Sequence, residues 1–139
     1  MTQQKRHNQD SSLCVSAPSC ITLARLRNHF RQKYRLSEPQ VETMVVSSSK
    51  SLKQGLENLK RFLAGDKSVE GPAAIYHGFK GLFLNMGEAE WAAFTKDIEQ
   101  KLSAGEQLDH SIIAGILRQG SVEILSYVGL IETGLLNGE

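Results

Sequence analysis

The sequence predicts an all-α protein, an antiparallel up-down-up-down four-helix bundle with an additional short N-terminal helix. Three observations predict this fold. Apolar residues recur three or four positions apart along most of the 139 residues, and glycine, proline or a capping residue marks the expected helix ends. The connections between the predicted helices are only a few residues long, which makes neighbouring helices antiparallel.

The N-terminal segment has two parts. Residues 1–18 are rich in glutamine, asparagine, serine and basic side chains without a periodic apolar pattern, so we expect a disordered tail before one domain at 19–139. A short helix follows and ends near Leu36, and we expect it to cap one end of the bundle. Its apolar positions are Leu23, Leu26, Phe30 and Tyr34.

The first bundle helix begins at the segment Ser37-Glu-Pro39, because proline is tolerated in the first turn of a helix. It extends to Gly65 as an amphipathic helix. Its apolar residues fall mostly three or four positions apart: Val41, Met44, Val45, Leu52, Leu56, Leu59 and Leu63.

The remaining helices have recognisable ends. Gly71-Pro72 begins the second bundle helix and Gly87 ends it. The third covers 88–102 and stops at Gly105. The fourth is capped by Asp109 and continues through Ile131, with a candidate kink at Gly120.

The second bundle helix contains a single histidine, His77. With about 100° of rotation per residue, the side opposite His77 is one apolar stripe. The stripe consists of Ile75, Phe79, Leu82, Phe83 and Met86. Small residues and one lysine lie near the histidine instead: Ala73, Ala74, Gly78, Lys80 and Gly81. We interpret this face as one that presents the imidazole to a partner.

The glycines and the lysine indicate which chemistry the histidine performs. Gly78 and Gly81 each cost roughly 1 kcal/mol relative to alanine inside a helix. Gly81 lies one turn beyond His77, where a missing side chain lets a bulky group approach. Lys80 places a cation where an anion on the imidazole would lie, and a phosphoryl group is the expected anion. The alternative interpretation is that glycine is simply common in this chain.

The segment His77-Gly-Phe-Lys80-Gly81, followed by Gly87, resembles the signature of histidine-containing phosphotransfer (HPt) domains. In that family a helix contains H-x-L-K-G, and a second glycine closes it ten residues after the histidine. The similarity covers most of residues 40–135. It includes the turn Leu63-Ala-Gly-Asp66 and the later positions Trp91, Phe94 and Ile98-Glu99.

The chain departs from the family pattern at several positions. Family members usually have alanine before the histidine, where this chain has Tyr76, and leucine or small residues where it has Phe79, Leu82 and Phe83. Leu84, at about 340° on the helical wheel, is an apolar residue on the exposed side beside His77. A docking surface would use Leu84, although a single surface leucine is also common.

The resemblance implies a phosphotransfer intermediate of a two-component phosphorelay. His77 would accept a phosphoryl group from an aspartate of a receiver domain, in a hybrid sensor histidine kinase or a response regulator, and pass it to another receiver. Lys80 would offset the phosphoryl charge and Gly81 would permit the approach. Partner docking would use Ala73, Ala74, Gly78, Leu84 and Gly87. Mg²⁺ is expected on the receiver, and we expect no metal and no cofactor on this chain.

Other functions have less support. The sequence contains no P-loop and no dinucleotide fingerprint, so we expect no autokinase activity. It also contains no evident triad or paired-acid spacing of a hydrolase. A non-catalytic adaptor or inhibitor that docks on a kinase or receiver domain is the alternative. A further one is the phosphoryl-accepting module of a chemotaxis kinase.

Composition limits the partners and the compartment. Hydrophobic residues make up 40%, charged residues 22%, and the formal net charge is +1. No apolar run is long enough for a membrane span or a secretory signal, so we expect a cytoplasmic protein without a membrane partner. Cys14 and Cys20 fit neither a zinc spacing nor a disulfide framework. The basic run 25–35 could contact nucleic acid or an acidic partner, but a solvated helix face is the favoured interpretation.

Overall fold

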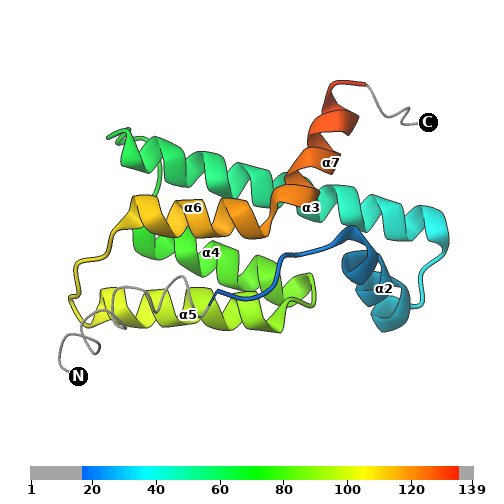
Figure 1. The fold of residues 1–139 in the computed structure, drawn as a ribbon, viewed down its shortest axis with the longest axis horizontal. Helices are drawn as coiled ribbons and strands as arrows, with labels where there is room; N and C mark the ends of the chain where they lie inside the picture. The colour runs from blue at the N-terminus through cyan, green and yellow to red at the C-terminus, as the bar shows by residue number, and fades with distance from the viewer. Residues whose placement is uncertain (1–16, 135–139) are drawn as a thin grey trace.

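The computed structural model describes residues 17–134, and the chain is helical without strands in that range (Figure 1). The predicted all-α class is confirmed. The helices are α2 (Leu23–Tyr34), α3 (Glu38–Leu63), α4 (Pro72–Asn85), α5 (Ala89–Ser103), α6 (His110–Gly120) and α7 (Val122–Glu132). The tail predicted at 1–18, including Cys14, lies outside the described residues except for its last two positions.

The helices α3, α4, α5 and α6 lie along one common direction, and each runs opposite to the one before it (Figure 1). Helix α4 packs between α3 and α5, and α6 packs on α3. Helix α2 lies against the first half of α3, at one end of the molecule. Helix α7 turns away from the direction of α6 and packs on α3.

Side-chain caps explain where α3 and α6 begin. The hydroxyl of Ser37 accepts a hydrogen bond from the backbone N–H of Gln40, and the Gln40 side chain accepts one from the N–H of Ser37. This reciprocal pair is a capping box. The carboxylate of Asp109 accepts hydrogen bonds from the N–H groups of Ser111 and Ile112. Both predicted helix starts are therefore confirmed.

The C-terminal part of the chain differs from the prediction. Residues 110–132 form two helices rather than one helix with a kink, and the break lies at Ser121. The carbonyl of Gly120 accepts a hydrogen bond from the N–H of Ile21 at 2.9 Å, which ties the end of α6 to the segment before α2. A side chain at Gly120 would also meet the ring of Trp91, since a Cβ there would lie 2.2 Å from Cζ2. The break between α6 and α7 thus coincides with two tertiary contacts of Gly120.

The apolar stripe predicted on α4 faces the core. Ile75, Phe79, Phe83 and Met86 are buried, and Leu82 is partly buried against the same cluster. At about 25 cal/mol per Å² of apolar surface, such burial holds α4 in one rotational setting. The opposite face of α4 is therefore held toward solvent.

Candidate functional site

His77 lies on the solvent-facing side of α4, and its side chain is 70% exposed. Its Nδ1 lies 3.0 Å from Oε2 of Glu99 on α5. Its Nε2 makes no hydrogen bond to the described residues. Three histidines fall in the range 17–134, and His77 is the exposed one among them. The predicted exposure of this imidazole is confirmed.

Glu99 connects His77 to Lys80. One carboxylate oxygen contacts the imidazole, and the other, Oε1, lies 2.9 Å from Nζ of Lys80. Oε1 is buried and makes no hydrogen bond of good geometry, so this ion pair is its polar contact among the described residues. Burial would raise the pKa of Glu99, but the contacts with Lys80 and His77 outweigh burial and lower the pKa below its usual value. Glu99 is therefore ionised at neutral pH.

This arrangement determines the chemistry of the imidazole. A carboxylate at 3.0 Å from Nδ1 favours the tautomer in which Nδ1 has the proton and donates it to Glu99. In that tautomer the lone pair of the ring resides on Nε2, which makes no hydrogen bond to the described residues.

Sequence reasoning named Glu99 within the family similarity but did not place it beside His77. A signal was available in the spacing. Helices α4 and α5 are antiparallel about Gly87, so a residue ten positions before Gly87 meets a residue about as far after it. Glu99 is twelve positions after Gly87 and on the same level as His77.

The small residues predicted around His77 form an exposed surface. Ala73, Ala74, Gly78 and Gly81 are all exposed. A Cβ placed on Gly78 or Gly81 would have no neighbouring atom within 4 Å. Leu84 is 56% exposed on the same helix. The face predicted for partner docking is thus open in the isolated chain.

Gly87 has a packing role that the sequence did not indicate. Its φ of +78° is a left-handed conformation that favours glycine after a helix. A Cβ at Gly87 would also lie 2.3 Å from Nδ1 of His29. The His29 ring is held there because its Nε2 lies 3.1 Å from the carbonyl oxygen of Asn85. Gly87 therefore closes α4 and lets α2 pack against the turn.

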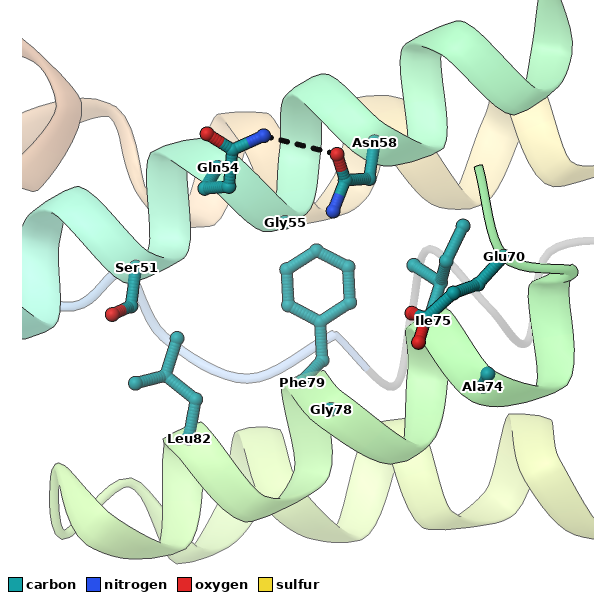
Figure 2. Close-up of a pocket in the computed structure, with 10 residues that line it drawn as sticks. All are labelled: Ser51, Gln54, Gly55, Asn58, Glu70, Ala74, Ile75, Gly78, Phe79 and Leu82. Atoms are coloured by element: carbon teal, nitrogen blue, oxygen red, sulfur yellow. Dashed lines mark hydrogen bonds between the residues drawn. The ribbon is translucent and has the colours of Figure 1, made fainter. Parts of the chain in front are cut away.

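An open groove of about 390 Å³ borders the histidine face on the α3 side (Figure 2). The ring of Phe79 points from α4 toward Gly55, where a Cβ would lie only 2.8 Å from the ring. Ala74 and Gly78 line the groove from α4, and Gln54 and Asn58, joined by a 3.0 Å hydrogen bond, line it from α3. The His77 face thus has a groove on one side and Glu99 on the other.

His110, in the first turn of α6, is paired with Tyr76 of α4. Its ring stacks on Tyr76 with centroids 5.6 Å apart, and its Nδ1 lies 2.7 Å from the Tyr76 hydroxyl. Asp109 provides the cap. Burial lowers the pKa of His110 more than Asp109 raises it, so the ring is neutral at neutral pH. Its Nδ1 is already hydrogen-bonded to Tyr76.

The basic run of α2 is largely neutralised by ion pairs. Arg25 contacts Glu88 at 2.8 Å, Arg27 contacts Glu42 at 2.6 Å, and Arg31 contacts Glu38 at 2.7 Å. These three acceptors come from the α4–α5 turn and from α3. The arginines therefore tie α2 to the rest of the fold, which weakens the case for a nucleic-acid surface.

Within residues 17–134 no helix is long and apolar enough to cross a membrane, and no cluster of metal-ligating side chains occurs. Comparisons with known protein families, curated proteins and solved structures find no match to this chain. The functional inference therefore rests on the site itself.

Proposed function

We propose that this chain is a histidine phosphotransfer protein of a two-component phosphorelay, in which the antiparallel bundle α3–α6 is the phosphotransfer core. His77 accepts a phosphoryl group from a receiver-domain aspartate and passes it to another receiver. The observation that supports the proposal most strongly is the exposed imidazole whose Nδ1 is held by an ionised glutamate, which also contacts Lys80. A histidine with only a packing role would not need this arrangement on an exposed surface of small residues.

The proposed transfer is a single displacement at phosphorus. The Nε2 lone pair of neutral His77 attacks the phosphorus of the aspartyl phosphate. The bond between phosphorus and the aspartate oxygen breaks, and its electron pair returns to the carboxylate. The imidazole ring keeps its Nδ1 proton and becomes positively charged, and the Glu99 carboxylate at 3.0 Å stabilises that charge. Transfer to the second receiver reverses these steps.

Lys80 has a role in the same step. It lies one turn after His77, and its Nζ is already held at the site by Oε1 of Glu99. The incoming phosphoryl group has a charge of about −1.5 to −2 at neutral pH, which attracts the ammonium group away from Glu99. Lys80 then offsets the charge on the phosphoryl oxygens. The receiver contributes Mg²⁺ and the remaining catalytic groups, so this chain mainly positions its nucleophile.

The receiver would dock on the exposed face of α4. Ala73, Ala74, Gly78 and Gly81 leave room around the imidazole, and Leu84 offers an apolar contact at the rim. The groove between α3 and α4 provides a concave surface next to this face. These features suit a partner that must bring its aspartate within bonding distance of Nε2.

The decisive experiment compares the wild-type chain with His77→Gln. Both are incubated with a receiver domain that has a radiolabelled aspartyl phosphate, and label on the chain is followed on gels. We expect rapid labelling of the wild type and none of the variant, with unchanged helicity by circular dichroism. Label on His77→Gln would contradict the assignment of His77, and an unlabelled wild type would contradict phosphotransfer.

A non-catalytic adaptor is the second candidate, because Leu84 and the α3–α4 groove can bind a partner without chemistry at His77. An adaptor would bind the receiver equally well as wild type and as His77→Gln and would never become labelled. A phosphotransfer protein loses labelling in the variant while binding remains. Binding and labelling measured on the same pair of proteins separate the two functions.

A further inference from the structure

A second hollow borders the histidine face, on the α5 side. It is an open depression of about 330 Å³ lined by Lys80, Lys96, Glu99, Gln100 and Ser103. All of its lining side chains are polar, and two are lysines. Glu99, which holds His77, forms part of its wall. The hollow is therefore continuous with the site through this glutamate.

Lys80 and Lys96 occupy equivalent positions across this hollow. Because α4 and α5 are antiparallel and His77 pairs with Glu99, the residue three after His77 lies level with the residue three before Glu99. These residues are Lys80 and Lys96. A lysine carries its ammonium group on a flexible four-carbon stem, so both ammonium groups can reach the space beside the imidazole.

Lys96 differs from Lys80 in having no ion pair among the described residues. Its helix neighbour Lys101 pairs with Asp97 at 3.2 Å on another side of α5. Lys96 is exposed and lines a hollow whose only acidic lining residue, Glu99, already contacts both His77 and Lys80. Because Glu99 is already engaged by His77 and Lys80, the ammonium group of Lys96 is suited to binding an anion other than Glu99.

The charge balance of the site identifies that anion. Two lysines and one glutamate give the hollow one excess positive charge while His77 is neutral. Transfer adds a phosphoryl group of about −2 and leaves one positive charge on the imidazole ring. With Lys96 included the loaded site is close to neutral, and without it the site has one excess negative charge.

We propose that the hollow between α4 and α5 is a phosphoryl-oxygen subsite and that Lys96 is its second cation, with Gln100 and Ser103 as additional hydrogen-bond donors. This inference rests on the proposed function and deepens it. Lys80 approaches the phosphoryl group from α4 and Lys96 approaches it from α5. The pair holds the phosphohistidine between transfers.

The test measures the phosphoryl group itself. The chain is phosphorylated with phosphoramidate or with a phosphorylated receiver, and the ³¹P chemical shift of the phosphohistidine is followed against pH. A cation about 5 Å away lowers the second pKa of a phosphoryl group by about half a unit. We therefore expect Lys96→Ala to raise that pKa by about this amount, Lys80→Ala to raise it at least as much, and Lys96→Arg to restore it.

Lys101→Ala is the matched control, since it removes a lysine from the same helix at a position that does not line the hollow. A wild-type phosphoryl pKa in Lys96→Ala, together with a shifted one in Lys80→Ala, would overturn this inference and leave the proposed function intact. If no His77-dependent ³¹P signal forms with either donor, the proposed function fails and this inference fails with it. Circular dichroism shows whether each variant is folded.

Discussion

The histidine face of α4 and the junction between α6 and α7 both contain glycine in a helical sequence, for opposite reasons. At the junction, the space beside Gly120 is filled by the Trp91 ring. On α4, the space beside Gly81 is empty. Gly115 is equally open on α6, so empty space alone does not identify a docking face. What distinguishes Gly81 is the imidazole one turn away.

The largest effect is expected at the junction. Gly120→Ala places a Cβ about where the Trp91 ring lies, 2.2 Å from Cζ2, so the ring or the helix must move. Overpacking of this kind costs about 1–3 kcal/mol of unfolding free energy. Urea denaturation measures the loss. Gly115→Ala, on the same helix, has no such clash and is expected to be stabilising by about 1 kcal/mol. Equal behaviour of the two variants would contradict the packing role of Gly120.

A smaller effect, on rate rather than stability, is expected from Glu99→Gln. The amide keeps the shape of the side chain but removes the charge that stabilises the cationic ring and holds Lys80. Groups that orient a reactive histidine typically contribute about 10-fold or more. We expect phosphotransfer from a labelled receiver to slow about 10-fold while the fold is retained. An unchanged rate would show that Glu99 does not act on His77.

The smallest effect is expected from Gly81→Ala. Alanine has the higher helix propensity and meets no atom within 4 Å, so the unfolding free energy rises by about 1 kcal/mol. The unfolding free energy of Gly115→Ala should rise by a similar amount, which makes it the matched control. A larger side chain distinguishes the two sites, because Gly81→Leu should slow phosphotransfer and Gly115→Leu should not. Equal rates in the two leucine variants would remove Gly81 from the docking face.

Local patterns predicted much of the fold. The start of α3 at Ser37, the cap at Asp109 and the buried stripe of α4 all depend on residues close together in sequence. The break between α6 and α7 was not predictable in the same way. It coincides with contacts to the N–H of Ile21 and the ring of Trp91, both distant in sequence from Gly120.

The candidate site shows the same division. The exposure of His77 and the small residues around it followed from the helical wheel. Its partner Glu99 required the register between two helices, which periodicity within one helix does not contain. The pairing of Tyr76 with His110 joins α4 to α6 across 34 positions, and nothing local to either residue indicated it.

The contact between Tyr76 and His110 has a consequence for how a partner meets the molecule. Tyr76, directly before His77, is completely buried and anchored to α6, while His77 itself is anchored to α5. Twisting α4 about its axis would rupture both anchors at once. These two anchors fix the orientation of the imidazole, so under the proposed function a receiver domain would dock as a rigid body without first reshaping α4.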